Sequence, residues 1–292
     1  MKRFLLVLFF PLALFAELNV AVSYPYIGAI AKSIGGDNIK VTVLAKGNWD
    51  PHFVVPRPSL IAQLRRSDAL IINGAQLEIG WMPALIRRSS NRKVMPNASS
   101  FLDLSQNVQL IQKPQVVDRS LGDVHPAGNP HFHLDPDNIL IISNVMKRFL
   151  TKIDPSNAGQ YEKNYELFKD EWSKNIRSWD TLMSEKKGLE VVQFHDVFAY
   201  FNRRYGIKTI GTIEPFPGIS PSSKHTLKLI SLIKEKKPYL LMHDVYHSTK
   251  SAEYIHDKTG LKMMKTPHDI EALDSVETLK SLFDYIVEEF QK

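Results

Sequence analysis

The stretch SNAGQYEKNYELFKDEWSKNIRSWDTLMSEKKG (156–188) predicts the longest single element of the chain. Its large apolar side chains recur every three or four residues, which is the spacing of one helix face: Tyr161, Tyr165, Phe168, Trp172, Ile176, Trp179 and Met183. The stretch contains no proline, and its one internal glycine lies near its start. A helix of this length measures ~45 Å, more than the width of a small domain. We therefore predict a helix over 156–188 that links two lobes.

On both sides of this segment, short apolar runs of strand length alternate with amphipathic stretches of helix length. Before it, strands are expected at 18–23, 40–45 and 69–75, and helices at 26–36, 56–68, 77–90 and 135–153. After it, strands are expected at 191–194, 207–213, 238–244 and 262–266, and helices at 196–206, 222–237, 248–260 and 275–290. Such alternation is typical of helices packed around a parallel sheet. The region from Ser105 to Asp135 lacks periodicity and predicts a surface loop.

The predicted fold class is α/β, with two lobes that are each a mainly parallel sheet flanked by helices, joined by one long rigid helix. A chain of 292 residues exceeds what one hydrophobic core usually serves, which also favours two domains. We expect a signal peptide at 1–16, an N-terminal α/β lobe at 17–155, the linking helix at 156–188 and a C-terminal α/β lobe at 189–292.

The leader MKRFLLVLFFPLALFA (1–16) predicts export. Lys2 and Arg3 precede an apolar run that ends near Ala16, which is the layout of a secretory signal peptide. A membrane-spanning helix needs ~20 apolar residues, more than this run offers. An uncleaved membrane anchor is the alternative, but Pro11 and the change to a strand pattern at Glu17 favour removal. Leu14 stands at the −3 position of the expected cut, where cleavage prefers a small residue, so the exact cut stays open. The expected location is the periplasm.

The composition excludes several classes of protein. Without cysteine there is no disulfide framework, no thiolate metal site and no lipid-modified cysteine, so we expect no lipid anchor. Loss of Lys2 and Arg3 with the leader lowers the formal charge from +6 to +4. The remaining basic residues are interspersed with acidic ones, as in EKKGLE (185–190) and KEKK (234–237). A nucleic-acid partner is therefore not expected, and we expect a monomer.

Three histidines occupy positions at which parallel α/β proteins place ligands, beside the ends of strands. His52 follows a predicted strand, His131 precedes the predicted helix start at Asp135, and His195 ends a strand and opens a helix. Taken alone, each also fits a solvated, capping or structural loop histidine. Without a local HExxH cluster, any site that they form is assembled by the fold where the lobes meet. Five further histidines can join such a site: His125, His133, His243, His247 and His268. The other two, His225 and His256, lie within helix patterns and are predicted at the surface.

Several segments together resemble the zinc/manganese-binding solute-binding proteins of bacterial ABC transporters, the metal-binding cluster A-I family. The resemblance covers nearly all of the mature chain, in order and spacing. It is carried by GNWDPHFVVPRPSLIAQLRRSDALIINGAQLEIGWMPALI (47–86), NPHFHLDP (129–136), DPSNAGQYEKNYELF (154–168), VVQFHDVFAYFNRRYGI (191–207) and IEPFPGISPSSKHTLKLISLIKEKK (213–237).

The resemblance implies two lobes joined by one rigid helix, with the metal buried between them. By motif position it implies four ligands: His52, His131, His195 and Asp274. The tyrosine that commonly follows the acid is missing after Asp274, so His268 or Asp269 can take its place.

This chain departs from the family pattern at three other points. His133 stands where the family usually has a large aromatic residue, and HDVYH (243–247) replaces a more usual Glu-Pro pair. The long His- and acid-rich loop of many zinc importers is reduced to VHPAGNPHFH (124–133). The roles of His125, His133, His243 and His247 stay open.

The implied ligand set favours binding and transport over catalysis. Imidazole nitrogens suit Zn²⁺, whereas Mn²⁺ prefers more oxygen; Mn²⁺ and Fe²⁺ remain open as cargo. Four protein ligands leave no position for a catalytic water, and no nucleophile or phosphate-binding motif is present. The expected function is periplasmic capture of zinc and its delivery to the membrane permease of an ABC importer with its ATPase. The alternative is an exported zinc metallohydrolase that uses the same three histidines.

Overall fold

The computed structural model describes residues 17–116, 118, 122 and 124–292, so the predicted signal peptide lies outside the described residues. In this part of the chain, eight strands form two parallel sheets of four strands each. The first sheet, in the order β2-β1-β3-β4, contains β1 (Leu18–Val22), β2 (Ile39–Val43), β3 (Ala69–Ile72) and β4 (Phe101–Asp103). The second, in the order β6-β5-β7-β8, contains β5 (Glu190–Gln193), β6 (Lys208–Thr212), β7 (Leu240–Asp244) and β8 (Met263–Thr266). The two lobes thus share one strand order, and the predicted fold class is confirmed.

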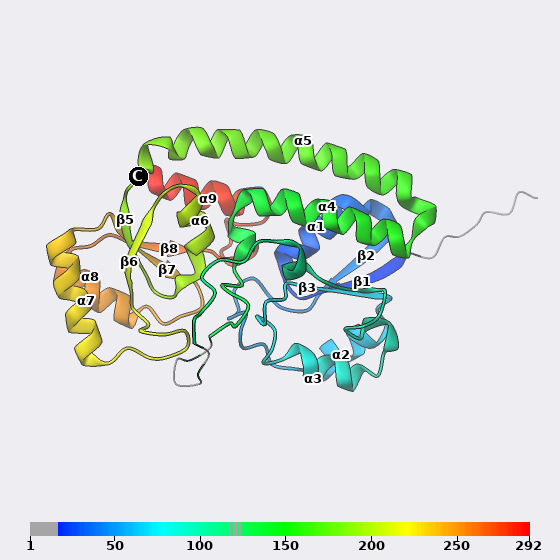
Figure 1. Cartoon of the computed structure of the whole chain (residues 1–292), viewed down its shortest axis with the longest axis horizontal. Coiled ribbons are helices and arrows are strands. Elements are labelled where there is room, and N and C mark those ends of the chain that lie inside the picture. Colours follow the sequence, from blue (N-terminus) through cyan, green and yellow to red (C-terminus); the bar gives the residue numbers. More distant parts are fainter. Residues whose placement is uncertain (1–16, 117, 119–121, 123) are drawn as a thin grey trace, which may run out of the picture.

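Helices flank both sheets (Figure 1). The N-terminal lobe contains α1 (Pro25–Gly35), α2 (Pro58–Arg65), α3 (Met82–Ser89) and α4 (Pro136–Ile153). The C-terminal lobe contains α6 (Ala199–Arg204), α7 (Ser223–Lys236), α8 (Lys250–Thr259) and α9 (Leu279–Gln291). The Asp135 carboxylate accepts a hydrogen bond from the backbone of Asp137 and so caps α4, which Pro136 opens.

The long helix α5 (Ala158–Met183) runs along the top of both lobes in Figure 1. It packs against α1 and α4 of the N-terminal lobe and α9 of the C-terminal lobe. Trp172 Nε1 donates to the carbonyl of Pro136 at 2.8 Å, and Trp179 Nε1 donates to Asp284 Oδ1 on α9 at 2.9 Å. These contacts join one helix to both lobes, as the apolar periodicity predicts.

The lobes also share apolar packing. One buried cluster includes Val20 and Ile71 of the first sheet, Trp172 and Trp179 of α5, and Phe283 of α9. A smaller cluster lies within the C-terminal lobe and includes Val192, Ile213 and Leu229. The lobes are therefore held by a continuous core as well as by α5. The domain boundaries expected from the sequence stay a prediction.

Two predicted details differ from the structure. Strand β4 was not expected, because three residues are too few to show a period. Helix α3 begins at Met82 and not at 77, because the chain first turns through Ala75 and Gln76 at positive φ (50° and 66°). The Glu78 carboxylate stabilises this turn by accepting hydrogen bonds from the backbone of Asn73 and Gly74 at 2.8 and 3.1 Å.

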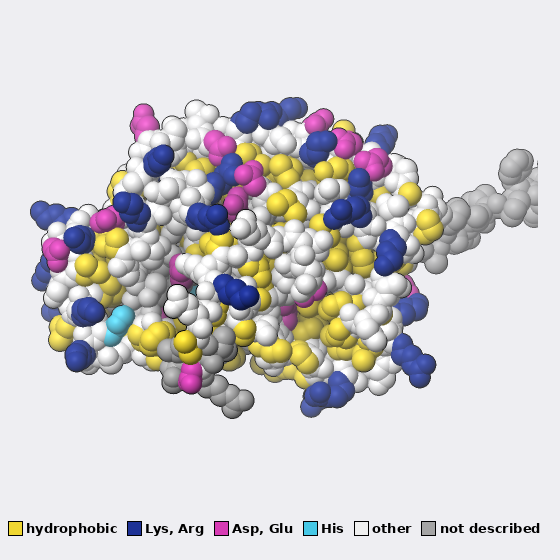
Figure 2. Space-filling model, in the orientation of Figure 1, with side chains coloured by type: hydrophobic (Ala, Val, Ile, Leu, Met, Phe, Trp, Pro, Cys, Tyr) yellow, Lys and Arg dark blue, Asp and Glu magenta, His cyan; other side chains and the backbone are white. Residues whose placement is uncertain are grey.

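The molecular surface agrees with the charge pattern of the sequence. On the face shown in Figure 2, lysines and arginines are scattered and alternate with acidic residues along the top of the molecule. A nucleic-acid binder would gather its basic residues in one stripe, and this face shows no such stripe. Within the described residues, no helix combines the length and apolar character needed to cross a bilayer.

Candidate metal centre

Three of the predicted ligands come together. One ligand atom from each of His52, His131 and His195 lies within 4.8 Å of the other two, and among the described residues this is the one such group of three. The ring centroids are 5.6 Å apart for His52 with His131 and with His195, and 5.8 Å apart for His131 with His195. The ring planes cross at 72° to 86°, so the imidazoles surround one point instead of stacking.

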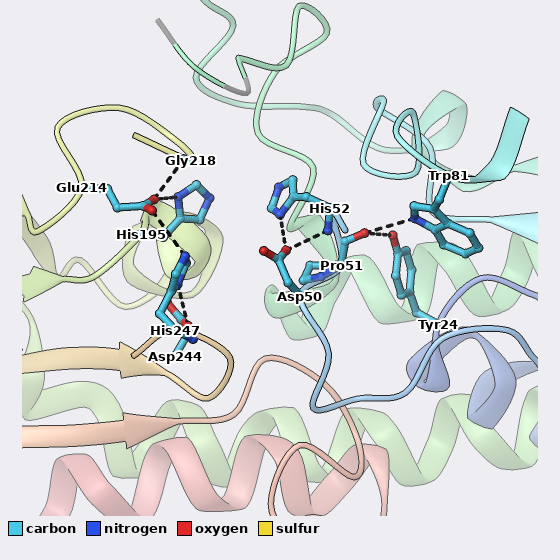
Figure 3. A network of polar contacts seen from close by, with 10 residues as sticks. All are labelled: Tyr24, Asp50, Pro51, His52, Trp81, His195, Glu214, Gly218, Asp244 and His247. Atoms are coloured by element: carbon cyan, nitrogen blue, oxygen red, sulfur yellow. Dashed lines mark hydrogen bonds and ion pairs between the residues drawn. The ribbon is translucent and has the colours of Figure 1, made fainter. Parts of the chain in front are cut away.

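The fold explains this convergence of residues that are remote in sequence. His52 lies in the loop between β2 and α2, His131 lies just before the short helical turn Phe132–Leu134 that leads into α4, and His195 follows β5 directly. In parallel sheets these strand-to-helix loops collect at one edge. Figure 3 shows His52 and its partners facing His195 and its partners across the site.

His52 is oriented by the residue two positions before it. Asp50 Oδ1 accepts a hydrogen bond from the His52 backbone at 2.9 Å and lies 2.9 Å from Nδ1 of the ring. The carbonyl of Pro51 accepts hydrogen bonds from the Tyr24 hydroxyl at 2.8 Å and from Trp81 Nε1 at 3.2 Å (Figure 3). With the Nδ1 proton directed at Asp50, the lone pair is on Nε2, which is buried and has no hydrogen-bond partner.

His195 is oriented in the same way, by residues of its own C-terminal lobe. Its Nδ1 lies 3.0 Å from Glu214 Oε2, and Glu214 Oε1 lies 3.3 Å from His247 Nε2. His247 Nδ1 in turn lies 2.8 Å from Asp244 Oδ1 (Figure 3). Burial alone would raise the pKa of Glu214, but the hydrogen bonds with His195 and His247 lower it to about 2. Burial likewise opposes protonation of His247, but Asp244 and Glu214 raise its pKa to about 9.

His131 is the most buried of the three, at 1 % exposure, and neither of its ring nitrogens has a hydrogen-bond partner. Burial, reinforced by the neighbouring imidazoles, lowers its pKa well below 6.5, so the ring is neutral at pH 7. Its backbone N–H donates to Asn129 Oδ1 at 2.9 Å. Asn129 Nδ2 donates to the carbonyl of Asp196 at 2.8 Å, which ties the His131 loop to the loop that carries His195.

These residues fit a divalent cation. Buried nitrogens without a partner lose ~1–3 kcal/mol of desolvation each, a loss that a bound cation would offset. Hydrogen bonds from histidines keep the pKa values of Asp50, Glu214 and Asp244 low despite burial, while His247 is protonated. The surroundings therefore carry two net negative charges. Zn–N bonds of ~2.0–2.1 Å place tetrahedral ligands ~3.3 Å apart, so the rings have to move inward slightly to bind.

The structure does not bring the fourth predicted ligand, Asp274, to this group. Asp274 is exposed in the loop between β8 and α9. The two substitutes, His268 and Asp269, are buried but are not part of the group of three, and Nδ1 of the His268 ring has no hydrogen-bond partner. Asp269 Oδ1 accepts from the backbone of Tyr26 at 2.9 Å, and the His268 carbonyl lies 2.8 Å from His133 Nε2. Both contacts tie the C-terminal lobe to the N-terminal one.

The remaining histidines divide into packing and surface positions. The His133 ring stacks on Tyr26 at 4.3 Å, and His243 Nε2 lies 3.2 Å from the carbonyl of Ser248. His256 is exposed, as predicted. His225 is half-buried, with Nε2 2.9 Å from the carbonyl of Thr212 at the end of β6.

The orienting carboxylates were missed from the sequence. Asp50 precedes His52 by two positions, and Glu214 follows the strand that ends at Thr212. The rule that ligand groups gather at strand ends could have found Glu214. Asp244, the last residue of β7, has the same signal.

Comparison with known proteins identifies the family. Residues 20–291 match the family model of the periplasmic zinc-uptake complex component A, ZnuA. The crystal structure of a zinc-bound 138–173 deletion mutant of ZnuA is similar, with a TM-score of 0.79 and 25% identity over 94% of this chain and 97% of that chain.

Curated relatives are named for other metals. The iron ABC transporter substrate-binding lipoprotein MtsA of Streptococcus pyogenes serotype M1 is 24% identical over 84% of this chain and 77% of its own length. The manganese ABC transporter substrate-binding lipoprotein PsaA of Streptococcus pneumoniae is 28% identical over 65% of this chain and 60% of its own length. The chain belongs to the zinc-uptake complex component A family and is an extracytoplasmic metal-binding subunit of an ABC importer, not an enzyme.

Proposed function

We propose that this protein, exported to the periplasm with residues 1–16 removed, captures Zn²⁺ with His52, His131 and His195 and delivers it to the membrane permease of an ABC importer, which works with its ATPase. The observation that carries the proposal is the group of three imidazoles whose ligand atoms lie within 4.8 Å of one another. Two of these imidazoles, His52 and His131, have buried nitrogens without hydrogen-bond partners.

The donor set supports zinc over the other metals carried by relatives. Imidazole nitrogen is a borderline ligand that suits Zn²⁺, whereas Mn²⁺ favours sites rich in oxygen. In this chain the nearby carboxylates of Asp50 and Glu214 are already engaged with Nδ1 of His52 and His195. They supply charge and orientation, and the imidazoles supply the bonds to the metal.

The surroundings also give the ion a route to the site. A cavity of about 230 Å³ is lined by residues of both lobes, among them Asp50, His52, His195, Glu214 and His247. Its carboxylates attract a cation on entry. Release to the permease requires only that the lobes separate enough to break the ring of ligands.

Zinc titration of the purified metal-free protein tests the proposal. His131→Ala removes a ligand whose nitrogens have no other partner, so we expect zinc affinity to fall by more than ~100-fold, beyond the loss caused by outer-shell changes. His256→Ala, on the exposed face of α8, is the matched control and should bind as the parent does. Affinity is measured by competition with a chelator. Equal zinc affinity in His131→Ala and the parent would refute the site.

The cargo itself is tested separately. Elemental analysis of the protein purified from its native periplasm should find zinc. Manganese or iron in its place would keep the capture function and overturn the assignment of zinc.

A further inference from the structure

Three histidines leave a tetrahedral zinc site one ligand short. Asp274 is exposed, and Asp50 Oδ1 and Glu214 Oε2 each lie within hydrogen-bond distance of Nδ1 of a ligand histidine. The obvious carboxylates are therefore either remote from the group or already used to orient it. A bound water or a further protein group near the three imidazoles has to complete the site.

His125 lies beside the group of three, although outside the 4.8 Å limit that joins its members. Its ring centroid lies 5.3 Å from that of His52, closer than His52 is to His131 or His195. Its Nε2 is buried and has no hydrogen-bond partner, a feature shared with Nε2 of His52 and His131. It lines a cavity of about 290 Å³ together with His131 and His195, and a second cavity of about 180 Å³ together with His52.

The unpartnered nitrogen of His125 is the one that can bind a metal. Nε2 is buried and has no hydrogen-bond partner, so its lone pair is free when the proton is on Nδ1. Burial and the nearby imidazoles of His52 and His195 lower the pKa of His125 to about 3, so the ring is neutral at pH 7.

We propose that His125 Nε2 is the fourth ligand of the metal, an inference that rests on the proposed function. The first shell is then four neutral imidazoles: His52, His125, His131 and His195. The two charges of the ion are balanced from behind by Asp50 and by the Glu214–His247–Asp244 group. An all-nitrogen shell also discriminates against Mn²⁺, which favours oxygen.

The position of His125 in the chain gives this ligand a particular role. It lies between the short helical turns Leu104–Asn107 and Phe132–Leu134, whereas His195 opens the C-terminal half. The segment around it also contacts the opposite lobe, since Gln112 Nε2 donates to Asp196 Oδ2 at 2.6 Å. The proposed fourth ligand thus comes from a segment that also contacts the C-terminal lobe.

Zinc affinity and ligand counting test the proposal on the full mature chain. His125→Ala should weaken zinc binding by more than ~10-fold. His125→Gln keeps a polar side chain at this position but removes the imidazole nitrogen, and it should lose a similar factor. X-ray absorption spectra of the zinc-loaded protein should show four imidazole nitrogens in the parent and three in both variants. His256→Ala is the control and should match the parent in both measurements.

Each result has a defined meaning. If His125→Ala weakens binding and His125→Gln does not, His125 only shapes the loop and the proposal is wrong. Three imidazoles in the parent spectrum would equally overturn it. If His131→Ala abolishes binding while both His125 variants bind as the parent does, the proposed function stands and only the fourth ligand fails. If His131→Ala also binds normally, the failure lies in the proposed function itself.

Discussion

At the scale of single residues, the site is built in two layers. The imidazoles of His52, His131 and His195 face one another, and carboxylates behind two of them decide which nitrogen is free. Glu214 contacts two histidines at once, because one of its oxygens lies 3.0 Å from His195 Nδ1 and the other lies 3.3 Å from His247 Nε2. A change at Glu214 should therefore alter metal binding without touching a ligand.

Glu214→Gln keeps the size of the side chain but removes its charge. We expect zinc affinity to fall by about 10- to 100-fold, because the one amide oxygen of Gln can accept from His195 or from His247 but not from both, and one negative charge leaves the site. Glu235→Gln, an exposed carboxylate on α7, is the matched control and should leave affinity unchanged. Chelator competition measures both variants. Parent-like affinity in Glu214→Gln would show that His195 is held in place by packing alone.

The sequence predicted the three histidines because their motifs carry a family resemblance and because strand ends collect ligands. Its fourth ligand, Asp274, is not part of the group of three. Asp274 was chosen by its order in the chain, but order does not show where a loop points, and this side chain faces solvent. The role of His125 stayed open, because nothing in its sequence neighbours shows that the fold brings its ring beside His52.

At the scale of elements, the long helix was the most predictable part of the chain and β4 the least. Seven apolar side chains at helical spacing define one face of α5, and five positions of the helix are buried. A three-residue strand such as β4 has no period, so only its pairing with β3 reveals it. The late start of α3 likewise depends on a tertiary contact, the Glu78 carboxylate bound to the backbone of the preceding turn.

The packing of α5 can be tested at Trp172, which is 3 % exposed and contacts the rings of Trp179 and Phe283. Trp172→Ala should lower the free energy of unfolding by ~3–5 kcal/mol, because it leaves a cavity where both lobes meet the helix. Leu167→Ala, at a position of the same helix that is 63 % exposed, should change it by less than ~0.5 kcal/mol. Urea unfolding measures both. Equal effects would mean that α5 does not hold the lobes through this face.

At the scale of the whole molecule, the two lobes are joined by more than α5. Tyr26 donates to Asp269, His133 contacts the His268 carbonyl, and Asn129 donates to the Asp196 carbonyl. Asn129 and His133 lie two residues from His131, and Asp196 follows His195, so the proposed metal site and the lobe junction share the same segments. Any change that charges the junction is therefore expected to loosen both.

Burial keeps four histidines of this junction neutral, and low pH should protonate them: His125, His131, His133 and His268. Burial lowers the pKa to about 3 for His133 and about 4 for His268, against ~6.5 in an unfolded chain. The unfolded state thus binds more protons below pH 6.5, so this stabilisation is complete above pH 6.5 and is lost as the pH falls toward 4. His247, with its pKa raised to about 9, acts oppositely, since its stabilisation is complete below pH 6.5 and is lost as the pH rises through 9.

We therefore expect the metal-free protein to lose unfolding free energy between pH 7 and pH 5, because four histidine pKa values are lowered. The raised pKa values of His247, of Glu78 (to about 7) and of Asp269 act in the opposite direction and make this loss smaller. Urea unfolding in the presence of a chelator measures this loss. His268→Gln removes one of the buried imidazoles and should reduce the loss, whereas His256→Ala, on the surface, should leave it as in the parent. Stability that is constant or rises from pH 7 to pH 5 would mean that these imidazoles are not held neutral where the lobes meet.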